Sequence, residues 1–216
     1  MLKEILKSPK LQELELSFKN RESVLIEDLW NTPKALIAAI ALQATKKHIL
    51  ILTGASQEEA RLYQDFSCFT DHPVIDFPAW ETLPTENIAP SPDIVGERYR
   101  ALHELSGAKT PHIVLSSLQA CLQKLIIPKS FADLYMQLVK GKSYPFQTLI
   151  GKLIKMGYQR CGIASDKGQF AVRGGIIDIF PVSLPDPYRL EFWENDLEND
   201  VENDLKMQMI YWKKGF

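Results

Sequence analysis

The sequence predicts an α/β protein in which a parallel sheet with flanking helices precedes a small α+β second domain. Up to about residue 127, short apolar runs alternate with segments of helical periodicity, which is typical of a parallel sheet with covered faces. From Pro128 onward the chain becomes basic, and residues 168–181 have the pattern of two strands joined at Gly174-Gly175. A chain of 216 residues can bury one good core together with a small second module.

The segment before residue 127 predicts the elements of the parallel sheet. Residues 2–18 have a helical pattern that Ser8-Pro9 interrupts. The helix expected at residues 34–44 has Thr32 as its candidate N-cap and Pro33 at its first position. We expect strands at residues 23–26, 48–52, 73–77 and 112–116, and further helices at residues 56–66, 93–105 and 117–125.

The segment after Pro128 predicts an amphipathic helix at residues 146–156, followed by the glycine-paired hairpin. Strand alternation puts Phe170 and Val172 on one side of the hairpin, and Gln169, Ala171 and Arg173 on the other. Residues 176–180 are apolar enough for a buried strand, and Pro181 ends it because proline cannot donate to a ladder. Arg173 lies at the lip of the turn, where its guanidinium is either solvated or able to grip a partner's carboxylate with two hydrogen bonds.

Composition and charge exclude several classes of function. With 25 basic and 27 acidic residues the chain is nearly neutral, so its net charge does not favour binding to nucleic acid. Cys68, Cys121 and Cys161 are isolated and lack CxxC spacing, which argues against a metal site or a disulfide framework and favours a reducing cytoplasm. The N-terminus is too charged for a signal peptide, and no apolar run is long enough to span a membrane.

A local basic excess is the one usable electrostatic feature. Between Pro128 and Arg173 only Asp133 and Asp166 oppose eight basic residues. The eight are Lys129, Lys140, Lys142, Lys152, Lys155, Arg160, Lys167 and Arg173. A solvated surface and an acidic partner, either protein or nucleic acid, both explain this excess.

The loop at residues 27–34 is where an α/β sheet of this order would hold a nucleotide. A phosphate-binding loop needs glycines that let the backbone wrap the phosphates, and a Lys followed by Ser or Thr. This loop has no glycine, it has Pro33 where an N–H is wanted, and Ala35 follows Lys34. We therefore expect no nucleotide cofactor, no metal and no catalytic group.

Three stretches carry a family resemblance: GQFAVRGGIIDIFP at residues 168–181, GYQR at residues 157–160, and DFPAWETLPTENIAPSPDIVGER at residues 76–98. The first closely resembles the second domain of the transcription-repair coupling factors (Mfd) and of their relative, the excision-repair protein UvrB. The third is much more similar to the coupling factors than to UvrB. All three run in family order, so the chain resembles an N-terminal piece of a coupling factor.

The resemblance implies a protein-interaction module whose second domain recruits UvrA in nucleotide excision repair. It implies a UvrA-binding face that carries Arg160, Phe170 and Arg173, with arginines for carboxylates and an aromatic anchor beside them. It also implies a degenerate P-loop NTPase-like first domain, because UvrB has a complete P-loop that the coupling factors have lost. Two other functions stay open: a non-specific DNA-binding module, and a part of the ATP-driven DNA translocase that complete family members form.

The expected domain division follows from these patterns. Residues 1–127 form the first domain, residues 128–193 the UvrA-interaction domain, and residues 194–216 a divergent tail. The tail holds an acidic four-residue repeat, and such runs usually stay solvated, so we expect it to be disordered. The motor motifs and the RNA-polymerase-binding module of the family lie outside these residues. An incomplete first domain should leave a sheet edge or an apolar face uncovered, which favours association.

Overall fold

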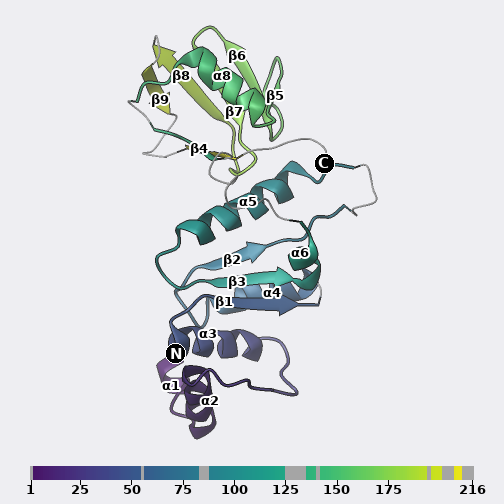
Figure 1. The fold of residues 1–216 in the computed structure, drawn as a ribbon, viewed down its shortest axis with the longest axis vertical. Coiled ribbons are helices and arrows are strands. Elements are labelled where there is room, and N and C mark those ends of the chain that lie inside the picture. Colours follow the sequence, from purple (N-terminus) through teal and green to yellow (C-terminus); the bar gives the residue numbers. More distant parts are fainter. Residues whose placement is uncertain are drawn as a thin grey trace. The chain divides into compact units, whose positions relative to one another are not determined.

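A computed structural model describes residues 2–54, 56–82, 88–124, 135–139, 142–193, 196–200 and 207–210 (Figure 1). The chain forms two compact units. The first consists of Met1–Ala79 and Ala101–Gln123, and the second of Trp80–Arg100 and Lys124–Phe216. The domain boundary expected at Pro128 lies outside the described residues. No helix in the described ranges is long and apolar enough to cross a membrane.

The first unit is built on a three-stranded parallel sheet in the order β1-β3-β2. Its strands are β1 (Ile49–Thr53), β2 (Val74–Phe77) and β3 (Ile113–Ser117). Its helices are α1 (Leu2–Ile5), α2 (Pro9–Lys19), α3 (Pro33–Thr45), α4 (Ser56–Phe66), α6 (Leu118–Leu122) and the end of α5 (Pro92–Gly107). The predicted parallel sheet with flanking helices is thus confirmed.

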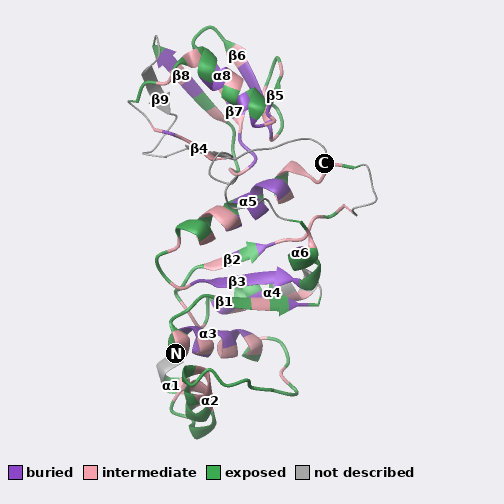
Figure 2. Ribbon diagram, viewed as in Figure 1, coloured by how far each residue is buried: buried purple, intermediate pink, exposed green. Residues whose placement is uncertain are grey.

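Helices cover both faces of this sheet, but not along its whole width. Side chains of α3 and α4 pack against Ile113 and Leu115 on one face, while Ala101 of α5 and Ala120 of α6 pack against Val114 on the other. The central strand β3 is therefore buried throughout (Figure 2). The edge strand β1 keeps Leu50 and Leu52 exposed by 57% and 51%.

Two local predictions for the first unit are wrong. Residues 23–26 do not form a strand, and Leu25 is 84% exposed, because no described strand pairs with this apolar run. Thr32 makes no side-chain capping bond, since its backbone is already helical at φ −47° and ψ −39°. Pro33 does begin α3, where its missing N–H costs nothing.

The second unit contains a five-stranded sheet in the order β5-β6-β7-β8-β9, and a separate pair of β4 and β10. Its elements are β4 (Tyr135–Leu138), α8 (Phe146–Lys155), β5 (Gln159–Arg160), β6 (Gln169–Arg173), β7 (Ile176–Phe180), β8 (Tyr188–Trp193), β9 (Asp196–Asp200) and β10 (Met207–Ile210). β5 runs parallel to β6, and the remaining pairs are antiparallel. The predicted helix and hairpin are present.

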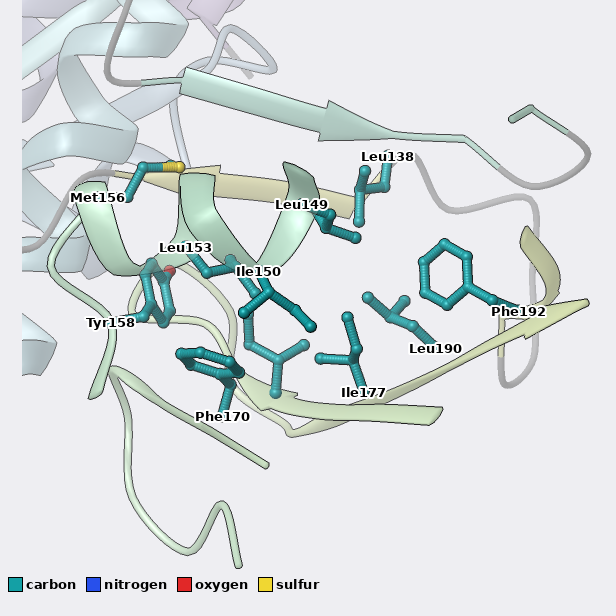
Figure 3. Packing of buried hydrophobic residues seen from close by; sticks show 11 residues of the cluster. Leu138, Leu149, Ile150, Leu153, Met156, Tyr158, Phe170, Ile177, Leu190 and Phe192 are labelled. Carbon is teal, nitrogen blue, oxygen red and sulfur yellow. The ribbon is translucent and has the colours of Figure 1, made fainter. Parts of the chain in front are cut away.

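The core of this unit lies between α8 and one face of the five-stranded sheet (Figure 3). Leu149, Leu153 and Met156 form the apolar stripe of the predicted helix at residues 146–156, and all three are buried, as is Ile150. They pack in one cluster with buried side chains of β4 and the sheet, namely Leu138, Phe170, Ile177, Ile179, Leu190 and Phe192. The face of the five-stranded sheet that α8 covers is therefore called the inner face, and the opposite face the outer face.

The structure differs from the expected disordered tail at two places. Residues 196–200 form β9 beside β8, and residues 207–210 form β10 beside β4. Backbone pairing satisfies N–H and C=O groups whatever the side-chain charge, and a segment directly after β8 can pair with it as a hairpin. An acidic composition therefore does not show whether a segment can pair as a strand. Residues 201–206 and 211–216 lie outside the described part of the chain.

The first half of α5 packs within the second unit. Val95 and Tyr99 of this helix cluster with Val182, and Trp80 lies against them. Arg98 is only 1% exposed, with its guanidinium carbon 4.4 Å from the centre of the Trp80 ring. This cation–π contact gives the buried arginine a favourable partner.

Candidate functional site

The outer face of the five-stranded sheet carries the predicted site arginine Arg173. Phe170 and Val172 of β6 belong to or pack against the core beneath α8, whereas Arg173 is exposed on the other side. Asp178 of β7 and Arg189 of β8 lie on the same outer face by strand register. The predicted division of the hairpin into two sides is confirmed.

Two glycines shape the turn that ends β6. Gly174 has a φ of +60°, a left-handed conformation that strains any other side chain. Gly175 lies so close to β8 that a Cβ atom there would come within 2.7 Å of the Phe192 carbonyl oxygen. The Phe192 N–H also donates to the Gly175 carbonyl oxygen at 2.9 Å. These constraints hold Arg173 at the lip of the turn, as the sequence predicts.

Arg173 and Arg160 both present a cationic side chain to solvent. Arg173 donates from its guanidinium to the Gly162 carbonyl oxygen at 3.1 Å, a neutral acceptor, and interacts with the nearby Asp178 carboxylate only through its charge. Arg160 is exposed on the two-residue edge strand β5, and its register with Phe170 places it toward the inner face of the sheet, whereas Arg173 lies on the outer face. Within the described part of the chain, neither arginine forms an ion pair with a carboxylate. Both are therefore placed to meet an acidic group of a partner.

The structure does not bring Phe170 to the surface. The Phe170 side chain is fully buried, among Tyr158, Ile177 and Ile179 in the core (Figure 3). Alternation along β6 turns it away from Arg173, and α8 covers the side toward which it points. The expectation that Phe170 is an exposed aromatic anchor is corrected here, because this residue supports the sheet from inside. Tyr158 is also buried in this core.

A second cation on the outer face is already compensated. The Arg189 guanidinium donates two hydrogen bonds to the Asp178 carboxylate, at 2.7 and 3.1 Å. These bonds, and the nearby charge of Arg173, hold the pKa of Asp178 below its usual value despite the opposing effect of burial. The same contact raises the pKa of Arg189. Arg173 is thus a better candidate than Arg189 for a partner's carboxylate.

The loop between β5 and β6 is fixed by its own hydrogen bonds. The side-chain oxygen of Gln169 accepts from the backbone N–H groups of Ser165 and Asp166, at 3.1 and 3.2 Å. The Gly168 N–H donates to the Phe180 carbonyl oxygen at 2.8 Å. Sequence reasoning gave this loop no role, although its position directly between Arg160 and β6 was the available signal.

Among the described residues, the basic excess of this domain does not form one continuous face; Lys129 and Lys140 lie outside the described part of the chain. Lys152 and Lys155 lie on α8, which covers the inner face of the sheet, whereas Arg173 lies on the outer face. Lys167 forms an ion pair with Asp93 at 2.5 Å. The cations are therefore divided between opposite sides, which suits a solvated surface with a local protein contact better than a groove for DNA.

The loop before α3 lines a shallow hollow of about 330 Å³ in the first unit. Its lining residues are Trp30, Asn31, Lys34, Glu58, Arg61, Leu62 and Asp65. Lys34, which begins the segment where a phosphate-binding lysine would be needed, forms an ion pair with Glu58. Asp65 and Arg61, which carry opposite charges, also line this hollow. No cluster of metal-ligating side chains occurs in the part of the chain that the structure describes.

A comparison with known protein families identifies the domain family that the second unit matches. The family model of the UvrB interaction domain matches residues 136–210, from β4 to β10. This match includes the hairpin, both site arginines and the two strands of the expected tail.

The wider comparison concerns most of the chain, which is similar to transcription-repair-coupling factors. That of Mycobacterium tuberculosis is 32% identical over 168 residues, which are 75% of this chain and 14% of the relative. That of Escherichia coli is 26% identical over 191 residues, or 88% and 16%, and that of Bacillus subtilis 25% over 175 residues, or 81% and 15%. The resemblance predicted from the three sequence stretches is confirmed. The chain spans about 14–16% of the length of these relatives.

Proposed function

We propose that this chain is the part of a transcription-repair coupling factor that recruits UvrA in nucleotide excision repair. The contact surface is the exposed edge formed by β5 and the end of β6, with Arg173 on its outer face and Arg160 toward its inner face as the charged residues. One observation carries the proposal: within the matched UvrB interaction domain, Arg173 is exposed at the glycine turn and bonded to a neutral carbonyl rather than to a carboxylate.

The chemistry of this surface suits a protein partner that is acidic. A guanidinium held at a fixed position can form two parallel hydrogen bonds with a carboxylate, which a lysine cannot do. Holding Arg173 by the Gly162 carbonyl also reduces the side-chain entropy lost on binding. The buried Phe170 contributes by supporting β6 from the inner face.

The remaining activities of the coupling factors belong to other parts of those proteins in this proposal. The first unit is a degenerate P-loop NTPase-like domain that binds no nucleotide, which the pairing of Lys34 with Glu58 supports. The chain is not itself an enzyme, and contacts with DNA or RNA polymerase are made through the longer protein.

A calorimetric titration with UvrA tests the two arginines. Arg160→Glu and Arg173→Glu should each weaken binding by roughly 2–5 kcal/mol, because each reversal leaves a partner carboxylate unpaired. Lys155→Glu on α8 is the matched control, since it reverses an exposed charge on a helix rather than at this edge of the sheet. It should bind as tightly as the parent, and circular dichroism should show all three variants folded.

Two results would contradict the proposal. One is a folded parent chain that does not bind UvrA, and the other is equal binding by the parent and both arginine variants. A parallel titration with duplex DNA separates the alternative function. Binding that is strong at low salt, falls steeply with salt and is insensitive to sequence would favour the DNA-binding module instead.

A further inference from the structure

Two large apolar side chains are exposed at the end of the sheet that carries Arg173. Ile163, in the loop after β5, is 69% exposed, and Trp193, the last residue of β8, is 71% exposed. Single exposed apolar residues are common on protein surfaces and need no explanation. The positions of Ile163 and Trp193 relative to Arg173, however, do call for an explanation.

The backbone fixes Ile163 beside the guanidinium of Arg173. Ile163 directly follows Gly162, whose carbonyl oxygen accepts the hydrogen bond from Arg173 at 3.1 Å. One end of the loop is tied by the Cys161 N–H, which donates to the Phe170 carbonyl oxygen at 2.8 Å. The other end is tied by the Gln169 side chain. The isoleucine is therefore held in place without being buried.

Strand register places Trp193 on the other side of Arg173. Arg173 lies opposite Ile176, and Ile176 lies opposite Glu191, so one row crosses β6, β7 and β8. A spacing of about 4.8 Å between strands puts the ends of this row about 10 Å apart. Trp193 is two residues beyond Glu191, and it points away from the buried Phe192 toward the outer face. It thus lies next to the glycine turn that follows Arg173.

We infer that Ile163 and Trp193 are the apolar anchors of the UvrA-binding surface and that Arg173 lies between them. This inference rests on the proposed function and replaces Phe170 in its expected role. Energetic centres of protein interfaces combine aromatic or arginine side chains with apolar neighbours that exclude water. The partner surface that fits has an acidic group with apolar patches on either side of it.

The test extends the UvrA titration of the folded full chain to three serine variants. Ile163→Ser and Trp193→Ser should each weaken UvrA binding about tenfold or more, because each removes an apolar contact that excludes water from Arg173. Ile154→Ser is the matched control, since this isoleucine of α8 is 55% exposed on the helix that covers the opposite face. Its affinity should stay within about twofold of the parent.

The outcomes separate this inference from the proposed function. If Arg173→Glu abolishes binding while both serine variants bind within twofold of the parent, the anchors are refuted and the proposed function stands. If the parent does not bind UvrA, both are refuted. Because Trp193 ends a paired strand, thermal melting must show that its variant is folded. Ile163 lies in a loop and gives a test that does not depend on strand pairing.

Discussion

Arg173 and Arg189 show how one residue type takes two roles on the same sheet face. Arg189 donates two hydrogen bonds to Asp178 on the neighbouring strand, so it stabilises the pairing of β7 with β8. Arg173 donates to a neutral carbonyl, so its guanidinium is not bonded to a carboxylate as that of Arg189 is. The difference comes from the facing residue: the cross-strand neighbour of Arg189 is Asp178, and that of Arg173 is Ile176.

The Asp178–Arg189 contact predicts a specific dependence of stability on pH. Arg189 holds the pKa of Asp178 below its usual value of 3.8. A lowered folded-state pKa adds stability above the unfolded value, and this stability is lost as the pH falls through the folded value. Asp178→Asn removes this contribution, so the melting temperatures of parent and variant should converge as the pH falls below 3.8. Thermal melts followed by circular dichroism across that range measure this.

Arg189→Gln provides an independent check on the same contact. It removes the hydrogen bonds that lower the pKa of Asp178 but keeps the carboxylate. Its melting temperature should converge with that of the parent in the same acidic range. A constant difference between parent and Asp178→Asn at every pH would show that the ion pair does not contribute through this carboxylate.

At the scale of whole elements, the sequence predicted those whose pattern is local. α4 spans the predicted residues 56–66, and the ends of β1, β2 and β3 lie within one residue of the prediction. Two of the strands that were missed depend on their partners for a recognisable pattern. β5 has only two residues and gains its identity from β6, while β4 pairs with β10 from the far end of the chain. The local pattern of apolar residues cannot predict such pairing.

The close contact between Gly96 of α5 and Val182 predicts the effect of adding one methyl group to this helix. A Cβ atom on Gly96 would overlap the Val182 carbonyl oxygen, so the helix can pack here only with glycine. Gly96→Ala should therefore destabilise the protein by about 1–3 kcal/mol, the usual cost of overpacking. Gly151 of α8 is the matched control, because a Cβ atom there meets nothing within 4 Å. Gly151→Ala should stabilise by about 0.5–1 kcal/mol, since alanine favours helix.

Urea denaturation of the parent and the two variants measures both effects. The prediction requires opposite signs at the two helical glycines, which general helix propensity alone does not give. Stabilisation by Gly96→Ala would show that the contact with Val182 is loose.

At the scale of the whole molecule, the site was predictable only in part. Alternation along β6 correctly separated Phe170 from Arg173, yet the family resemblance placed both in one contact set. Which side of the hairpin faces solvent depends on α8, whose packing is a tertiary fact. Ile163 and Trp193 could not be recognised from sequence, because their exposure follows from a rigid loop and from the register of β8.

The uncovered edge of the parallel sheet in the first unit predicts that whole molecules associate. β1 is an edge strand of five uncharged residues, Ile49–Thr53, and no described strand covers its outer edge. Antiparallel pairing of two copies centred on Ile51 would place Leu50 of each copy opposite Leu52 of the other. Both leucines are more than half exposed, so this pairing would bury apolar surface on that face as well as completing the ladder. We therefore expect concentration-dependent association of the isolated chain.

A lysine on this edge should suppress the association, because a charge on an edge strand opposes pairing with another strand. Light scattering coupled to size-exclusion chromatography should show Leu50→Lys more monomeric than the parent at equal concentration. Leu16→Lys is the control, since this leucine of α2 is also 57% exposed but lies outside the sheet. A parent that stays monomeric at the highest soluble concentration would refute the prediction. Equal suppression by both lysine variants would show that added charge, rather than the β1 edge, controls the association.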